Sequence, residues 1–194
     1  LKKRKDVRIA ALCDINPETL ARRIGEYGGK PFTHYRKMLD ALPLDAVWIC
    51  TPSQVRREML IDCARRRIPV MCEKPVERSE AKAARIARDL GKLRARVQIG
   101  YVFRSMPMIG RLRDAMRDDR IHLAQSMYVC PMSIERKMAA WFFDKVKSGG
   151  ALIDQATHNF DLLRYLLGDV KEVQGLARNP VHKKKGAYTI DETL

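Results

Sequence analysis

The stretch P-V-M-C-E-K-P at residues 69–75 decides which fold this sequence is expected to adopt. Four mostly apolar residues lead directly into an acid, a base and a proline. A short apolar run with an abrupt polar end is typical of a buried parallel strand, and its loop then lies at the edge where open α/β sheets bind ligands. Lys74 is therefore a candidate site residue, although an exposed lysine before a proline that begins a helix would give the same pattern.

The segments around this stretch alternate between strands and helices. We expect further strands at residues 7–14, 31–33, 45–50 and 97–103, and helices at residues 17–27, 35–41, 55–66 and 80–90. Asn16 is a suitable N-cap for the first helix, Pro17 suits its first position, and the two glycines after Tyr27 would end it. Ser79 and Gly91 would begin and end the helix at 80–90. Alternation with short connections predicts an α/β fold built on a doubly wound parallel sheet.

The pattern changes near residue 100. We expect a helix at 108–117, a long strand at 121–130, a helix at 151–167 that Gly168 ends, and a strand at 170–177. Longer strands with fewer helices between them suit the mostly antiparallel sheet of an α+β domain. The sequence therefore predicts two domains, an incomplete doubly wound domain at 1–100 and an incomplete α+β domain at 101–194.

The chain has 194 residues and a formal net charge of +15, which raises the question of a nucleic-acid partner. The basic residues are spread over most segments, and the sequence contains no RNP motif, zinc-finger spacing or basic zipper. We therefore expect the charge to attract anionic small molecules rather than nucleic acid. A basic nucleic-acid-binding module remains the alternative.

Two further features restrict the setting in which the protein is expected to work. No apolar run approaches the roughly 20 residues that a membrane-spanning helix needs, so we expect no membrane partner. The five cysteines occur singly, without a C-x-x-C pair, which argues against a zinc or disulfide framework, and we expect no metal. Dispersed cysteines at the ends of apolar runs indicate small buried side chains and a reducing, cytoplasmic setting.

Asp14 ends the first expected strand directly before a helix. In dinucleotide-binding folds an acid in this place binds the adenosine ribose hydroxyls and repels a 2′-phosphate, which favours NAD, with NADP as the alternative. A turn aspartate without a ligand would look the same. The phosphate loop G-x-G-x-x-G should lie roughly 20 residues earlier. Only thirteen residues precede Asp14 and none is glycine, so we interpret the first strand, loop and helix as missing.

The expected helix at 151–167 carries Asp154 and His158 one turn apart, so both side chains lie on one helix face. Asp161 follows His158 by three residues on the same face. A carboxylate beside a histidine fixes its tautomer and is expected to raise its pKa, which suits proton transfer to or from a hydroxyl group. A surface pair without a function is the alternative, and Gly149-Gly150 before the helix favours the functional interpretation.

Together these stretches resemble the Gfo/Idh/MocA oxidoreductases, the group of glucose–fructose oxidoreductase and inositol dehydrogenase. The resemblance rests on C-D at residues 13–14, C-T-P at 50–52, C-E-K-P at 72–75, G-Y-V-F-R at 100–104 and S-G-G-A-L-I-D-Q-A-T-H-N-F-D at 148–161. They follow the family's order and usual separations over about residues 6–175. The chain is therefore identified as a member of this family, truncated at both ends.

The resemblance implies a role for each matching residue. Lys74, Asp154 and His158 would be catalytic and contact the substrate, with His158 as general acid and base. Tyr101 and Arg104 would line the substrate cleft. The residues that would contact the cofactor are Asp14, Ile15, Cys50, Thr51, Pro52, Glu73 and Lys74. Among them, Asp14 would bind the adenosine ribose. Residues 1–100 would be the NAD(P)-binding domain, and residues 101–194 the substrate and oligomerisation domain.

The resemblance also implies an activity and a partner class. The expected protein is an NAD(P)-dependent dehydrogenase that oxidises a hydroxyl group of a sugar, an inositol-like polyol or a sugar derivative, and that forms homo-oligomers. An NAD-dependent glycosidase and a non-catalytic, cofactor-sensing regulator are the alternatives within this fold. Two departures matter. The phosphate loop is absent, so we expect the 194-residue chain alone to be inactive, and Arg56 stands where the family commonly has histidine.

Overall fold

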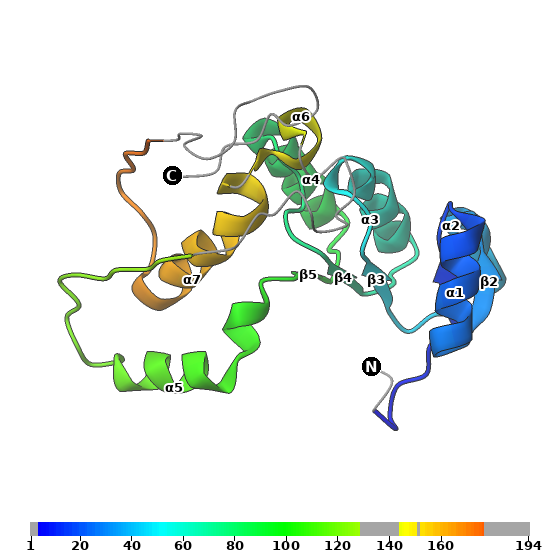
Figure 1. Ribbon diagram of the computed structural model, residues 1–194, viewed down its shortest axis with the longest axis horizontal. Helices are drawn as coiled ribbons and strands as arrows, with labels where there is room; N and C mark the ends of the chain where they lie inside the picture. The colour runs from blue at the N-terminus through cyan, green and yellow to red at the C-terminus, as the bar shows by residue number, and fades with distance from the viewer. Residues whose placement is uncertain (1–3, 129–143, 151, 177–194) are drawn as a thin grey trace.

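The computed structural model describes residues 4–128, 144–150 and 152–176 of the 194-residue chain (Figure 1). The α/β half contains β1 (Ala11–Cys13), α1 (Pro17–Tyr27), β2 (Lys30–Phe32), α2 (Tyr35–Ala41), β3 (Val47–Ile49), the 3-10 turn η1 (Ser53–Val55), α3 (Arg56–Arg65), β4 (Val70–Cys72), α4 (Glu80–Lys92) and β5 (Val97–Ile99). The second half contains the 3-10 turn η2 (Val102–Ser105), α5 (Pro107–Ala115), α6 (Lys145–Ser148), the π-helical segment η4 (Leu152–Ala156) and α7 (Thr157–Leu167).

The strands are short and parallel, and they lie in two groups. β1 pairs with β2, while β3, β4 and β5 form a second sheet with β4 in the middle. Figure 1 shows α1 and α2 beside the pair, and α3 and α4 beside the three-stranded sheet. The predicted parallel α/β fold is therefore confirmed. In the described residues no ladder joins β1 to β3, so the strands do not form one continuous sheet.

The core lies between the three-stranded sheet and helices α2, α3 and α4, and the β1–β2 pair packs against it through Ala11, Cys13 and Phe32. Leu60 and Cys63 on α3, Cys72 on β4 and Ile86 on α4 are the most completely buried side chains. The same cluster is completed by Met38, Leu39, Ile49 and Val70. Because apolar burial contributes roughly 25 cal/mol per Å², this cluster is the main stabilising contact of the half that carries Lys74.

The helix ends show how the local sequence sets the element boundaries. Asn16 is the N-cap of α1, where its side chain accepts from the Thr19 amide at 3.0 Å, and Gly28 ends the helix with a φ of 74°. These predictions are confirmed, as is the end of α7 at Gly168. The predicted stop at Gly91 is wrong, because α4 continues to Lys92. One glycine weakens a helix by about 1 kcal/mol and does not break it.

The second half differs from the predicted antiparallel sheet. Residues 121–128 and 170–176 form no strand, so the strands expected there are wrong over those residues. A strand needs a neighbour for its backbone N–H and C=O groups, and neither segment pairs with a strand in the described part of the chain. The expected strand at 97–103 also ends early, because η2 begins at Val102. Residues 129–130 and 177 lie outside the described residues.

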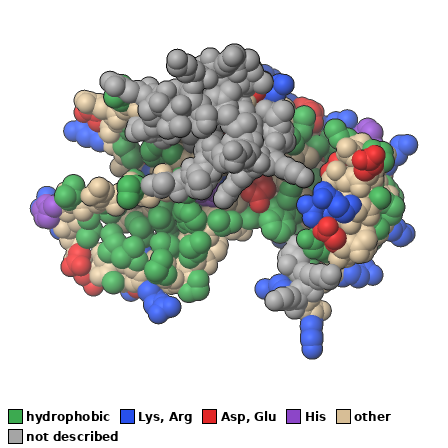
Figure 2. All heavy atoms as spheres, viewed as in Figure 1, with side chains coloured by type: hydrophobic (Ala, Val, Ile, Leu, Met, Phe, Trp, Pro, Cys, Tyr) green, Lys and Arg blue, Asp and Glu red, His purple; other side chains and the backbone are tan. Residues whose placement is uncertain are grey.

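Hydrophobic side chains gather over α5, at the lower left of the face in Figure 2. Met106, Met108 and Leu112 are among the exposed apolar residues there, and Met108 is 67% exposed. Across the described ranges, the structure has no helix that combines the length and the apolar character needed to cross a membrane.

Candidate active site

The carboxyl ends of β3, β4 and β5 lie side by side. Ile49, Cys72 and Ile99 are paired across the sheet. The pairing continues one residue further, because the Glu73 amide donates to the Ile49 carbonyl at 2.9 Å and the Gly100 amide donates to the Cys72 carbonyl at 2.8 Å. The loops that follow these strands therefore share one edge of the sheet, which is where parallel sheets bind ligands.

Gly100 allows the Glu73 carboxylate to lie against the backbone after β5. A Cβ at Gly100 would stand 3.2 Å from Glu73 Oε2 and 3.5 Å from the Cys72 carbonyl oxygen. Since the first distance is shorter than an ordinary van der Waals contact, any larger residue would displace the Glu73 side chain. The glycine thus leaves the space that Glu73, a predicted cofactor residue, occupies.

Lys74 reaches from the end of β4 to the segment that carries Asp154. Its Nζ donates a hydrogen bond to the Asp154 carbonyl oxygen and lies 3.6 Å from Asp154 Oδ1. Only 14% of the Lys74 side chain and 12% of the Asp154 side chain are exposed. A buried ammonium group is stable only when such partners offset its lost hydration. Two residues that are 80 positions apart therefore form one polar contact inside the molecule.

Asp154 belongs to the π-helical segment η4, which runs directly into α7. Single π-helical turns are rare and often occur at functional sites. Gly149, with a φ of 88°, ends α6 just before this segment, and a Cβ there would lie only 2.9 Å from Ile153 Cβ. Gln155 Nε2 donates to Asp154 Oδ2 at 2.5 Å. Both carboxylate oxygens of Asp154 therefore face a nitrogen, one from Lys74 and one from Gln155.

His158 lies on α7 among aromatic rings. Its ring centroid is 4.9 Å from that of Phe103 and 6.2 Å from that of Tyr101, which meets it edge-on. His158 Nδ1 is buried and has no hydrogen-bond partner within the described ranges. A buried polar atom of this kind costs free energy unless a hydrogen bond satisfies it, and such atoms are often found at functional sites.

The pKa of His158 is lowered from its ordinary value of 6.5, mainly because burial disfavours the imidazolium and further because Lys74 is positively charged. The carboxylates of Glu73, Asp154 and Asp161 act in the opposite direction but do not outweigh these causes. The raised pKa expected from the sequence is therefore wrong in direction, because it rested on the neighbouring carboxylates alone. A neutral imidazole can accept a proton near pH 7.

Tyr101 and Arg104 connect the segment after β5 to α7. The Tyr101 hydroxyl lies 3.3 Å from Thr157 Oγ1. Arg104 forms a bidentate pair with Asp161, with Nε donating to Oδ2 at 2.7 Å and Nη2 donating to Oδ1 at 2.5 Å. Asp161 thus holds Arg104, while the edge of the Tyr101 ring faces His158. Arg104 has a protein partner in the place where the sequence suggested a substrate contact.

The loop after β3 brings Cys50, Thr51 and Pro52 to the same sheet edge. Cys50 is exposed, so the expectation of a buried side chain is wrong for this cysteine, whereas Cys72 is fully buried. Thr51 Oγ1 lies 3.7 Å from Met59 Sδ, and the Thr51 carbonyl accepts from Arg56 Nε at 2.7 Å. Cys130 lies outside the described residues. The three predicted cofactor residues of this loop therefore lie one strand away from Glu73.

Asp14 and Ile15 follow β1, in the other strand group. Asp14 Oδ1 accepts from the Asn16 amide at 2.8 Å, a local bond typical of a turn aspartate. Ile15 is 90% exposed. Among the described residues no hydrogen bond or ion pair joins either residue to Lys74 or His158. The structure therefore brings the three predicted catalytic residues together and places the predicted ribose acid apart from them.

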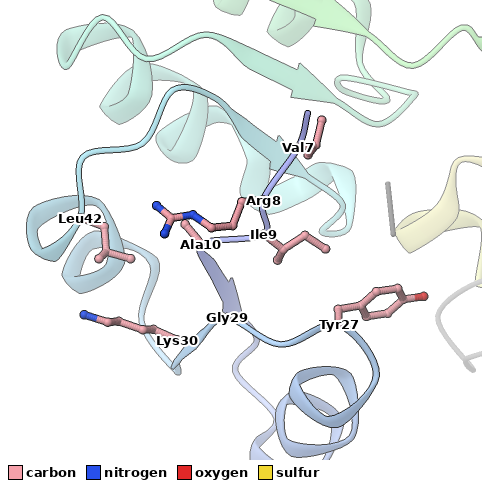
Figure 3. A pocket seen from close by; sticks show the side chains of 8 residues that line it. All are labelled: Val7, Arg8, Ile9, Ala10, Tyr27, Gly29, Lys30 and Leu42. Carbon is pink, nitrogen blue, oxygen red and sulfur yellow. The ribbon is translucent and has the colours of Figure 1, made fainter. Parts of the chain in front are cut away.

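A hollow in the surface lies away from all of these residues (Figure 3). It is lined by Val7, Arg8, Ile9, Ala10, Tyr27, Gly29, Lys30 and Leu42. Of its lining residues, Val7 to Ala10 directly precede β1 and Lys30 is the first residue of β2, whereas Asp14 follows the end of β1. The hollow thus lies at the opposite end of the β1–β2 pair from the predicted ribose acid and contains no predicted site residue.

Sequence reasoning missed three contacts of the site. Phe103 and Gln155 received no role, although both lie within stretches that carry the family resemblance, and this was a usable signal. Arg56 was noted only as a departure from the family. A charged residue at the start of a helix is ordinarily exposed, so the sequence carried no signal that Arg56 would be buried.

The two parts of the chain match two family models. Residues 1–101 match a model described as an oxidoreductase family with an NAD-binding Rossmann fold. Residues 112–193 match the GFO/IDH/MocA C-terminal domain.

Several known proteins resemble the chain over most of its length. The rhizopine catabolism protein MocA of Rhizobium meliloti is 33% identical over 165 residues, which cover 84% of this chain and 50% of that protein. An inositol 2-dehydrogenase of Rhizobium meliloti (strain 1021) is 28% identical over 169 residues, covering 84% of this chain and 48% of that protein. The chain spans about half the length of these curated relatives.

A solved structure shares the fold. The WlbA dehydrogenase from Bordetella pertussis, in complex with NADH and UDP-GlcNAcA, superimposes with a TM-score of 0.70 at 25% sequence identity. The superposition covers 83% of this chain and 48% of that one.

Proposed function

The chain belongs to the GFO/IDH/MocA oxidoreductase family, and we propose that the protein carrying it is an NAD-dependent dehydrogenase of a sugar or polyol hydroxyl group. The observation that carries this proposal is the buried contact of Lys74 with Asp154 close to His158. The names of the inositol 2-dehydrogenase and of WlbA, solved with NADH and a nucleotide sugar, support the substrate class and the cofactor.

Two groups of described residues support a dinucleotide site in this proposal. Asp14 follows a parallel strand, where a carboxylate can bind ribose hydroxyls, and its charge favours NAD over NADP. Gly100 leaves room for the Glu73 carboxylate at the sheet edge, beside the predicted cofactor loop at residues 50–52. The 194 residues contain no G-x-G-x-x-G motif for the pyrophosphate. NAD, when bound, supplies nicotinamide C4 as the hydride acceptor.

His158, Lys74 and Asp154 have different roles in removing a proton from a hydroxyl group. His158 is neutral near pH 7 because its pKa is lowered, so it can accept the hydroxyl proton. The ammonium group of Lys74 stabilises the negative charge that develops on the oxygen as the proton leaves. Asp154 holds Lys74 through its carbonyl oxygen and its carboxylate, which fixes the direction of the ammonium group.

The test is oxidation of a panel of sugars and polyols, including myo-inositol, followed by the absorbance of NADH. We expect Lys74→Ala and His158→Ala each to lower kcat/KM by roughly 10²–10⁴-fold, the range for a positioned acid–base group. Lys82→Ala changes an exposed lysine of α4 and should keep the wild-type rate. Unchanged turnover in both site variants would refute the assigned roles.

The same assay separates the alternatives within the fold. A dehydrogenase accumulates NADH in proportion to oxidised product. An NAD-dependent glycosidase would release a sugar with no net NADH, and a cofactor-sensing regulator would bind NAD without turnover. Absence of NADH with every substrate of the panel would refute the dehydrogenase proposal.

We further propose two domains, at residues 1–100 and 101–194, in a cytoplasmic homo-oligomer. The limits of the two matched regions, residue 101 and residue 112, support the division. The four cysteines in the described ranges are free thiols, which suits a reducing compartment. Light scattering on the eluting peak of a gel-filtration column measures the oligomeric state, and a monomer would contradict this part of the proposal.

A further inference from the structure

We propose that Arg56 is a positioning residue for Lys74, because its buried guanidinium group holds the backbone carbonyl groups of the residues before and after that lysine. The inference rests on the proposed function, in which Lys74 is a catalytic residue, and adds to it a residue from α3. This role is inferred from three hydrogen bonds that Arg56 donates and from the positions of their acceptors in the sequence.

The Arg56 side chain binds the two loops at the sheet edge. Its Nε donates to the Thr51 carbonyl oxygen at 2.7 Å, in the loop after β3. Its Nη1 donates to the carbonyl oxygens of both Glu73 and Pro75, in the loop after β4. Nη1 therefore holds the residue before Lys74 and the residue after it. Nε of the same guanidinium group holds the loop after β3, so Arg56 links the two loops.

Burial makes these bonds hard to replace. Arg56 is only 5% exposed, and an arginine is rarely buried unless partners satisfy its donors. It takes part in none of the ion pairs among the described residues; its acceptors are backbone carbonyl oxygens. A guanidinium group presents several N–H donors in a fixed plane, whereas a lysine presents one compact ammonium group. Lysine at this position cannot reach all three carbonyl oxygens in the same geometry.

The consequence for Lys74 follows from the geometry of the chain. The backbone on either side of Lys74 determines where its side chain begins. Arg56 holds this backbone at the peptide that joins Glu73 to Lys74 and at the peptide that follows Pro75, while Nζ reaches the Asp154 carbonyl oxygen. Without these bonds, a shift of the loop after β4 would move Nζ away from Asp154 and from the neighbourhood of His158.

The first test measures Lys74 directly and needs no enzymatic activity. The 194-residue chain is treated with acetic anhydride, and mass spectrometry gives the acetylation rate of each lysine. We expect Lys74 to be protected in the wild-type chain and to react roughly tenfold faster in Arg56→Lys, the factor that corresponds to losing one hydrogen bond. The matched control is Arg57→Lys, because Arg57 is 40% exposed and pairs with Glu58 on α3 and Asp89 on α4, away from the loops that Arg56 binds.

Reaction of the fully buried Cys63 with a thiol reagent shows whether each variant is folded. If Lys74 stays as protected in folded Arg56→Lys as in the wild type, the inference is refuted. If Arg56→Lys unfolds, NMR of the wild-type chain decides, since the Arg56 Nε proton should exchange far more slowly than that of the exposed Arg23. Equal exchange rates for these two protons would also refute the inference.

The second test uses the active protein and separates this inference from the proposed function. Arg56→Lys should lower kcat by roughly tenfold, with smaller changes in the KM values for NAD and substrate, because binding contacts remain. Arg57→Lys should leave kcat and both KM values unchanged. If wild-type protein forms no NADH while Lys74 is still exposed by Arg56→Lys, the proposed function fails and the positioning role stands. If kcat is unchanged although Lys74 becomes reactive, the positioning role has no catalytic consequence and the inference fails.

Discussion

The sheet β3–β4–β5 and the pair β1–β2 are both parallel and built from strands of three residues, yet they differ in burial and in what they carry. The three-stranded sheet contributes the buried residues Ile49, Val70 and Cys72 to the core cluster, against which the pair packs only with partly buried residues, and it carries Glu73 and Lys74 at its edge. In the pair every strand residue is at least partly exposed, and the predicted ribose acid Asp14 bonds mainly within its own turn. The residues proposed for proton transfer therefore rest on the better packed unit.

The largest effect expected from this difference is on stability. Leu60→Ala removes a fully buried side chain of the core cluster and should lower the free energy of unfolding by about 2–5 kcal/mol. Leu20→Ala makes the same chemical change on α1, beside the pair, and should cost less because Leu20 is not a member of that cluster. Urea unfolding followed by circular dichroism measures both. Equal costs would show that the two units are packed alike.

A smaller effect is expected at the helix caps. Asn16→Ala removes the side-chain bond to the Thr19 amide and should cost about 1 kcal/mol. Ser79→Ala changes the N-cap residue of α4, whose side chain makes no cap bond. This change should lower the free energy of unfolding by only about a few tenths of a kcal/mol. Thermal unfolding of the two variants compares them. A larger loss for Ser79→Ala would contradict the assignment of the cap bonds.

The smallest effect is expected in the pH dependence of stability. The pKa of His158 is lower in the folded chain than its ordinary value of 6.5, so the unfolded chain binds more protons just below pH 6.5. The contribution of neutral His158 is therefore complete above that pH and is lost as the pH falls through the window below it. His158→Gln should remove this slope, while His34→Gln, at an exposed site before α2, should keep it. A slope of the same size in His158→Gln would show that His158 is not the source of this pH dependence.

Much of the α/β half could be predicted because its signals are local. The cap at Asn16, the stop at Gly28 and the polar ends of apolar runs each act on a few neighbouring residues. The place of Lys74 at a sheet edge followed from the polar end of the apolar run at residues 69–75. The meeting of Lys74 with Asp154 came only through the family resemblance, because spacing on a helix does not say which strand the helix packs against.

The remaining features depend on contacts between distant segments. The separation of β1 from β3, the π-helical segment η4 and the burial of Arg56 have no local pattern that predicts them. The direction of the His158 pKa shift was wrong because burial by Phe103 and the charge of Lys74 both come from elsewhere in the chain. Residues 121–128 have an extended pattern, but a strand forms only where another strand lies beside it.

The contact between Lys74 and Asp154 is the central claim, and a double-mutant cycle of unfolding free energies tests it most directly. Lys74→Met leaves the Asp154 carboxylate without its ammonium partner, and Asp154→Asn removes the carboxylate charge while the Asp154 carbonyl oxygen still accepts from Lys74, so each single change should destabilise the chain. The double change removes both charges and should cost less than the sum of the two, with a coupling of roughly 1–3 kcal/mol. Additive losses, with a coupling near zero, would show that the two side chains do not meet.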